Sequence, residues 1–423
     1  MGRYLLTLSA RYDGSSRLAE GHKWVLFPSA ALAWRISDEP FMKDLVWLDN
    51  LKLRVGYGKT GNSAVSPYQT KGQLALRHYV FNNGSSEYIG YAPSVMANDQ
   101  LTWETTDQWN VGVDFGFLKN RINGTVEFYL QNTKDLLLKR QLPVVSGFSS
   151  VMSNVGSTRN KGIEITLNTR NIMNRNFTWS TDLTFSANKE EIVELYNGKT
   201  DDVGNLWFIG QPIDVYYNYK KIGIWQNTEN DLAEMAKFNE KGANFKPGSI
   251  RLEDVDGDYK ITEEDKQILG SVRPKFVASM VNNFEFKGFD LSVFLYASVG
   301  GLLRNNIEFM EKPGRGNTVK VDYWTPTNPT NAFPRPSVDV EKLDYISTLG
   351  YDKADFLRIR NITLGYTLPE MWSKKVLMDK IRIYLSANNP AIFTNFTGID
   401  PEGANGRTAP SYSTWMFGIN LSM

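Results

Sequence analysis

The dominant pattern in this sequence is an alternation of apolar and polar side chains with a period of two. Between Ile122 and Gln131, the even positions carry Ile, Gly, Val, Phe and Leu, while the odd positions carry Asn, Thr, Glu, Tyr and Gln. Such alternation predicts a β-strand with one apolar and one polar face. We predict about twelve such strands from this pattern, beginning near Tyr4, Val25, Leu51, Thr102, Arg121, Gly162, Phe177, Lys275, Phe289, Phe356, Ile381 and Ser413.

The predicted strands are long, and the connections between them alternate in length. At roughly 9 to 13 residues, they exceed the usual soluble strand of about 5 or 6 residues and suit a tilted membrane-spanning strand of about 9 to 11. Short connections are expected at 119–120, 171–176 and 287–288, with slightly longer ones at 38–50 and 369–380. Long connections are expected at 15–23, 61–101, 134–161, 188–274, 300–355 and 390–412.

This sorting of connections favours an all-β, antiparallel transmembrane β-barrel with long extracellular loops, because outer-membrane barrels have short periplasmic turns and long outer loops. Tryptophans near predicted strand ends suit interfacial girdles; they are Trp24, Trp34, Trp47, Trp103, Trp109, Trp179 and Trp415. The alternative is a soluble β fold in which these aromatic residues form the core.

Composition excludes several classes of chemistry. The 423 residues include 47 basic and 46 acidic side chains, for a net charge of +1, which gives no basic footprint for nucleic acid. The chain has no cysteine, so disulfides, thiolate zinc sites and iron–sulfur clusters are excluded. His22 and His78 stand apart, without the spacing of a zinc or Ser-His-Asp hydrolase. We find no catalytic constellation and expect that the chain is not an enzyme.

Several segments occur in an order that resembles a known family. They are 11–17 (RYDGSSR), 27–34 (FPSAALAW), 51–62 (LKLRVGYGKTGN), 160–164 (NKGIE), 210–212 (GQP), 223–225 (GIW), 247–251 (PGSIR), 254–265, 356–366 (FLRIRNITLGY) and 397–402 (TGIDPE). In this order and spacing the chain resembles the SusC/RagA family of TonB-dependent outer-membrane transporters.

The resemblance implies that residues 1–423 are the C-terminal half of a barrel of about 22 strands. The plug and N-terminal domains of the family have no counterpart here, and 188–274 corresponds to a large extracellular loop. It further implies TonB-dependent import of large nutrients, glycan oligosaccharides or peptides, across the outer membrane of a Gram-negative bacterium. The partners implied are a SusD-like surface lipoprotein, outer-membrane lipid, and TonB acting through the missing N-terminal half.

One segment of the long loop has the spacing of a calcium site. With Asp254 as position 1, carboxylates of Asp254, Asp256, Asp258 and Asp265 fall at positions 1, 3, 5 and 12, and the carbonyl of Lys260 falls at position 7. Position 6, normally glycine, is Tyr259, so we expect a strained backbone there. The spacing predicts a Ca²⁺ site; the alternative is an Asp/Gly-rich turn without metal. Thr262 and Asp265 are also expected to cap a short helix reaching Gln267.

Two further motifs have competing interpretations. Gly56, Gly58 and Gly61 match a dinucleotide fingerprint, but no helix is predicted after them, so we expect lumen-facing glycines rather than a nucleotide site. Trp207, Trp225 and Trp324 in the long loops are candidates for substrate binding by stacking on sugars; the alternative is that they pack the loops together. The second functional hypothesis is a secreted soluble protein that binds carbohydrate with Ca²⁺.

Overall fold

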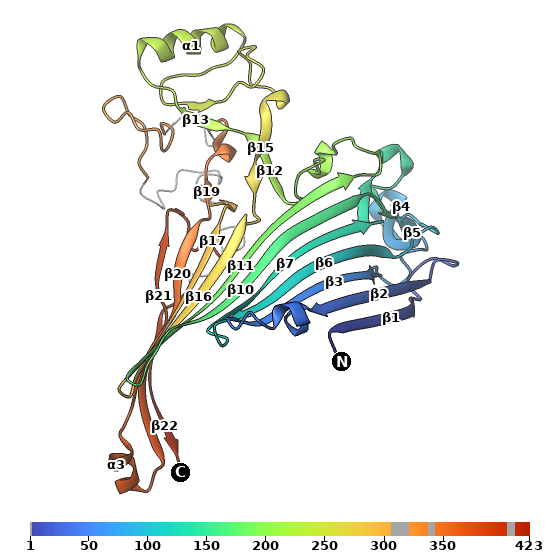
Figure 1. Ribbon diagram of the computed structural model, residues 1–423. Helices are drawn as coiled ribbons and strands as arrows, with labels where there is room; N and C mark the ends of the chain where they lie inside the picture. The colour runs from blue at the N-terminus through green and yellow to red at the C-terminus, as the bar shows by residue number, and fades with distance from the viewer. Residues whose placement is uncertain (1, 306–320, 337–342, 404–410) are drawn as a thin grey trace. The chain divides into compact units, whose positions relative to one another are not determined.

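A computed structural model describes residues 2–305, 321–336, 343–403 and 411–423 (Figure 1). Two compact units divide the chain. Unit 1 comprises Met1–Ile213 and Ala278–Ser292, and unit 2 comprises Asp214–Val277 and Val293–Met423. Part of the long connection expected over 300–355 lies outside the described residues. Among the helices of the described residues, none is both long and apolar enough to cross a bilayer.

Twelve strands form one antiparallel sheet, in the order β1-β2-β3-β6-β7-β10-β11-β16-β17-β20-β21-β22. In Figure 1 the strands β1, β2, β3, β6, β7, β10 and β11 of this sheet lie side by side as successive ribbons. The twelve are β1 (Tyr4–Gly14), β2 (Trp24–Arg35), β3 (Leu48–Asn62), β6 (Glu104–Phe117), β7 (Ile122–Lys134), β10 (Ser157–Met173), β11 (Phe177–Glu194), β16 (Phe276–Phe286), β17 (Phe289–Val299), β20 (Phe356–Thr367), β21 (Lys380–Thr394) and β22 (Thr414–Ser422).

The connections contain smaller elements that the alternation pattern did not predict. Five two-stranded sheets join β4 (Gln73–Phe81) to β5 (Ser86–Val95), β8 (Leu137–Gln141) to β9 (Ser150–Asn154), β12 (Val215–Tyr219) to β15 (Lys266–Ser271), β13 (Lys221–Ile224) to β14 (Ile250–Leu252) and β18 (Leu302–Arg304) to β19 (Tyr351–Lys353). In the part of the chain that the structure describes, the helices are α1 (Glu229–Glu240) and α3 (Glu370–Ser373), with 3₁₀ turns η1 (Ile36–Asp38), η2 (Pro40–Met42), η3 (Asn82–Gly84), η4 (Val144–Ser146), η5 (Val203–Asn205), η6 (Glu263–Asp265), η7 (Ile346–Thr348) and η8 (Lys374–Val376).

The prediction of twelve long antiparallel strands is confirmed, but their length range was too narrow. Strand β10 begins at Ser157 rather than near Gly162, and β11 continues to Glu194. The alternation of short and long connections also holds for most of the sheet. The two connections expected to be slightly longer contain helical turns: η1 and η2 follow β2, and α3 and η8 follow β20.

Cross-strand register gives the sheet two chemically different faces. One row consists of apolar side chains, paired from strand to strand in the order Leu6, Leu32, Val55, Val111, Phe128 and Ile163. The first five of these are exposed in the described chain. Because neighbouring residues of a strand point to opposite faces, the other face carries the polar positions. An apolar outer face and a polar inner face are what a membrane-spanning barrel requires.

A cluster of charges lies on the polar face across β3, β6 and β7. The guanidinium of Arg54 donates to Asp114, with Nη2 2.9 Å from Oδ1, and also to Glu127. Lys52 Nζ lies 2.7 Å from Asp114 Oδ2. Thr125 donates its hydroxyl to Asp114 at 3.2 Å. A single guanidinium therefore links carboxylates on two successive strands.

A small apolar core in unit 1 explains one glycine of the motif, Gly61. Leu18, Phe27, Val65 and Trp103 form a buried cluster, and a Cβ added at Gly61 would lie 2.3 Å from the Phe27 ring. Gly61 therefore permits close packing of rings over the backbone. Residues 63–67 contain no helix, as expected, so the motif lacks the helix N-terminus of a dinucleotide site. Trp103 is buried in this core, so it does not belong to an interfacial girdle.

Candidate functional site

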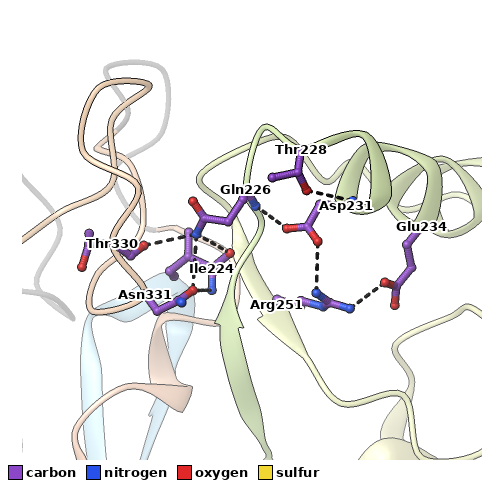
Figure 2. A network of polar contacts seen from close by, with 8 residues as sticks. All are labelled: Ile224, Gln226, Thr228, Asp231, Glu234, Arg251, Thr330 and Asn331. Carbon is purple, nitrogen blue, oxygen red and sulfur yellow. Dashed lines mark hydrogen bonds and ion pairs between the residues drawn. The ribbon is translucent and has the colours of Figure 1, made fainter.

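The long connection after β11 folds into a structured region of unit 2 around helix α1. The Thr228 hydroxyl caps the helix by accepting from the N–H of Asp231. Asp231 in turn accepts from the N–H of Gln226 at 2.7 Å (Figure 2). Arg251 Nη1 lies 3.3 Å from Asp231 Oδ1, and its Nη2 lies 2.6 Å from Glu234 Oε2. Asp231 and Glu234 share a helix face because they are three residues apart, so one arginine from β14 binds both.

A second set of polar contacts ties the strand β13 to the segment 330–332. Asn331 Oδ1 accepts from the N–H of Ile224 at 2.9 Å and from the Gln226 amide at 3.3 Å (Figure 2). The Gln226 amide also donates to the carbonyls of Ile224 and Thr330. Segments far apart in sequence are therefore joined by side-chain amides, which have both donors and acceptors.

Two of the three tryptophans predicted to bind substrate lie in the core of this region. Trp225 is 1% exposed and packs with Phe238 and Phe245, and Arg251 lies 4.4 Å above its ring. Trp324 is 5% exposed, and its Nε1 donates to Gln226 Oε1 at 2.8 Å. Both rings are buried in the packed loop region, as the alternative interpretation expects. Trp324 also lines a small pocket with Pro247 and Arg335, so substrate binding by these two tryptophans stays a prediction. Trp207 is half-buried, and its role as a substrate contact stays a prediction.

The structure brings three of the predicted metal ligands together. Asp254, Asp256 and Asp265 each place a carboxylate oxygen within 4.8 Å of the others. Asp265 is completely buried, and its oxygens accept from the N–H groups of Val255 and Thr262 at 2.8 and 2.7 Å. Hard oxygen donors grouped around one point are the ligand set that Ca²⁺ prefers. The three carboxylates therefore fit a Ca²⁺ ion in charge and donor type.

The other two predicted ligands are the carboxylate of Asp258 and the carbonyl of Lys260. Asp258 lies outside the three-carboxylate group and accepts from the N–H of Lys260 at 2.7 Å.

Thr262 and Asp265 form a reciprocal capping box, as expected, but the helix they cap is the 3₁₀ turn η6, which ends at Asp265 rather than reaching Gln267. The strand β15 begins directly afterwards.

Tyr259 has the left-handed backbone expected at position 6 of the loop. Its φ is +61°, a conformation that usually favours glycine. Its N–H donates to Asp254 Oδ2 at 2.9 Å. The ring lies 5.5 Å from that of Phe238, and Lys237 Nζ lies 4.9 Å above it. A tyrosine here therefore adds a contact between the loop and helix α1 that glycine could not make.

Some residues that organise this region were not identified from sequence. The Arg251 contacts require Asp231 and Glu234 on one helix face, and helix α1 was not predicted inside the long loop. Lys221 is a second case, since its ammonium donates hydrogen bonds to the carbonyls of residues 331 and 332, more than a hundred positions away. For the Arg251 contacts, the sequence did contain one signal: the acidic residues Asp231 and Glu234 are three positions apart and are followed by the basic Arg251.

Comparison with known proteins gives consistent results. The family described as "TonB dependent receptor-like, beta-barrel" matches residues 1–415. TonB-dependent receptor P3 of Formosa agariphila is 33% identical over 451 residues, covering 99% of this chain and 44% of the relative. TonB-dependent receptor SusC of Bacteroides thetaiotaomicron is 32% identical over 443 residues, covering 100% of this chain and 42% of the relative.

A solved structure extends the likeness to the fold. The structure of the RagAB peptide transporter superposes with a TM-score of 0.81 at 25% sequence identity, covering 99% of this chain and 46% of that chain. The chain thus spans less than half the length of the relatives that it matches. These findings confirm the SusC/RagA resemblance and do not favour a secreted soluble protein. The chain belongs to the TonB-dependent receptor β-barrel family of the Gram-negative outer membrane.

Proposed function

We propose that this chain is the C-terminal portion of the barrel of a TonB-dependent importer of large nutrients. The observation that carries the proposal is the two-faced antiparallel sheet, together with the family match. One face has the apolar row through Val111, and the other has the charge cluster of Arg54, Asp114 and Glu127. A polar inner face solvates a hydrophilic solute on its way through the bilayer. Energy from TonB would act through the N-terminal half of the receptor.

The cargo that we propose is a glycan oligosaccharide or a peptide, delivered with a SusD-like surface lipoprotein. Peptide cargo is supported by the likeness of the fold to RagAB, which is a peptide transporter. Glycan cargo follows from the SusC/RagA resemblance of the sequence. The long connections that contain β4, β5 and α1 supply the loop surface that a lipoprotein would contact.

Uptake by whole cells tests this proposal. Cells lacking the receptor gene, cells lacking TonB and wild-type cells would each receive fluorescent oligosaccharides in one arm and fluorescent peptides in the other. We expect wild-type cells to accumulate one cargo class and both mutants to lose that uptake. Affinity purification of the tagged full-length receptor should recover a surface lipoprotein. Equal uptake of both cargo classes by all three strains would contradict the proposal.

We also propose that the loop from Asp254 to Asp265 holds Ca²⁺. The grouping of three carboxylates within 4.8 Å supports it, as does the burial of Asp265. Bound there, the ion would neutralise the mutual repulsion of the carboxylates and stiffen a loop next to helix α1. Its contribution would be structural, because it lies in the same folded region as the packed rings of Phe238 and Tyr259.

A further inference from the structure

Unit 2 contains a pocket of about 540 Å³ between the strands β15, β18 and β19. Part of its wall is apolar, formed by side chains such as Ile268, Leu302 and Leu349. Its polar side includes Lys221, the first residue of β13. Ligand sites commonly have this composition, an apolar wall with a few fixed polar groups.

Lys221 is a half-buried cation without a counterion. Its ammonium donates to the carbonyls of Asn331 and Ala332, at 2.8 and 2.6 Å. Among the described residues, no carboxylate lies within 4.0 Å of it. Burial lowers the pKa of Lys221, because removal of water disfavours the charged form. An ammonium has three N–H donors, so one is left after these two bonds.

The second cation of the pocket, Lys220, already has a carboxylate partner, and the pocket's carboxylate, Asp352, accepts hydrogen bonds from a neighbour. Lys220 Nζ lies 3.0 Å from Glu253 Oε2, and this contact holds the pKa of Glu253 below its usual value. Glu253 also accepts from the Gln267 amide at 2.7 Å. Asp352 accepts from the hydroxyl and the N–H of Thr397. Of the two lysines at this pocket, Lys221 is therefore the one whose charge an anionic ligand is better placed to balance.

We propose that this pocket is a binding site for ligands that carry a carboxylate, with Lys221 as the group that recognises it. A carboxylate would accept the remaining N–H of the ammonium and offset its unpaired charge, while the rest of the ligand lies against the apolar wall. Partly desolvated, charge-assisted hydrogen bonds of this kind are stronger than neutral ones. The proposal rests on the proposed import function only for the source of the carboxylate, which is either a uronic acid of a glycan or the C-terminus of a peptide.

Calorimetry on the detergent-solubilised full chain tests the proposal with pairs of ligands that differ only in charge. The peptide arm compares N-acetyl-Ala-Leu with its C-terminal amide, and the glycan arm compares digalacturonate with its methyl ester. In at least one arm, we expect the acid to bind about tenfold or more tightly than its neutral twin, as a charged hydrogen bond predicts. Because the measurement needs neither TonB nor a lipoprotein, it decides the site even if the uptake experiment fails.

Three variants connect that preference to Lys221. Lys221→Met should abolish the difference between acid and neutral ligand, and Lys221→Arg should retain it. Lys353→Met is the matched control, since Lys353 follows the lining residue Asp352 but does not line the pocket. Lys221→Met also removes the two hydrogen bonds to Asn331 and Ala332, so thermal melting of each variant checks that it is folded, and Lys221→Arg keeps a donor at this position. Equal binding of acid and neutral ligands, no binding of either acid, or an acid preference retained in Lys221→Met would each overturn the proposal.

Discussion

The guanidinium of Arg358 lies 2.7 Å from the carboxylate of Asp400, and the two side chains are only 3% and 7% exposed. Arg358 lies near the start of the strand β20, while Asp400 lies in the connection between β21 and β22. Arg358 Nε is 2.9 Å from Glu402 Oε2, but without hydrogen-bond alignment. Arg360 also donates to Glu402. The connection is therefore fixed to the strand by a network of charges.

Loss of the Asp400 carboxylate should release this connection. Asp400→Ala leaves Arg358 buried with weaker compensation, and breaking a buried pair in this way costs about 3–5 kcal/mol. We expect residues 395–403 to exchange their amide hydrogens faster, measured by mass spectrometry on the full chain. The double variant Arg358→Met, Asp400→Leu removes both charges and should be less perturbed than the single variant. A single variant with wild-type exchange would contradict this prediction.

The same pair predicts the acid sensitivity of the connection. Burial by itself would raise the pKa of Asp400, but the Ser411 hydroxyl, the N–H groups of Glu402 and Ser411, and Arg358 lower it to about 2. A lowered carboxyl pKa stabilises the folded form fully above the unfolded value of about 3.9. That contribution is lost as the pH falls toward 2. Exchange of this connection, corrected for intrinsic rates, should stay constant from pH 7 to about 5 and increase below about 4. An increase already complete at pH 5 would rule out Asp400 as its cause.

The Asp254–Asp265 loop gives a prediction about metal. Calcium titration by calorimetry should detect binding to the wild-type chain, and Asp256→Ala should weaken it by about tenfold or more, because each carboxylate contributes charge to the site. Glu264→Ala is the control, since Glu264 is an exposed carboxylate of the same segment outside the three-carboxylate group. Equal affinity of Asp256→Ala and wild type would remove the site.

Gly61 should be intolerant of a side chain. Gly61→Val would place its Cβ 2.3 Å from the Phe27 ring and 3.0 Å from Trp103, which requires the buried core to move. Overpacking of this kind costs about 1–3 kcal/mol, so we expect lower thermal stability in heat-modifiable gel migration. Gly58→Val is the matched control, because nothing lies closer than 3.8 Å to its added Cβ. Equal loss of stability in both variants would show that glycine flexibility, rather than ring packing, matters here.

The two faces of the sheet can be tested with adjacent residues of β6. Val111→Lys places a charge on the apolar face and should destabilise the membrane-inserted protein by about 2–4 kcal/mol. Asn110→Lys places the same charge on the polar face, beside Glu127, and should have little effect. Urea titration in lipid vesicles measures the difference. Similar stabilities for the two variants would mean that the faces are assigned wrongly.

The strands were predictable because membrane and lumen impose opposite polarity on successive residues. That signal fades where strands extend beyond the bilayer. The end of β11, from Asn188 to Glu191, is polar on both faces, so its length could not be read from alternation. The hairpin of β4 and β5 was missed for a related reason, since many of its apolar side chains, such as Leu74 and Tyr91, are exposed. Because neither face of this hairpin is buried, its sequence does not show a regular alternation of apolar and polar residues.

In the candidate site, features set by neighbouring residues could be predicted, whereas features set by residues distant in sequence could not. The Asp loop is a local spacing motif, so the grouping of Asp254, Asp256 and Asp265 and the unusual backbone of Tyr259 could be anticipated. The burial of Trp225 depends on Phe238, Phe245 and Arg251, which come together only when α1 and β14 pack. Sequence alone contained no signal that distinguishes a tryptophan in such a core from one that binds a sugar.

The bridge from Arg54 to Asp114 and Glu127 has a consequence for assembly in the membrane. Sliding one strand by a single residue turns all of its side chains to the opposite face. A shifted β6 would keep most of its backbone hydrogen bonds, but Asp114 would leave Arg54 and enter the acyl chains. Since charged groups are costly in hydrocarbon, this one arginine penalises misaligned pairings on two neighbouring strands. The bridge therefore favours the correct strand register when the sheet forms.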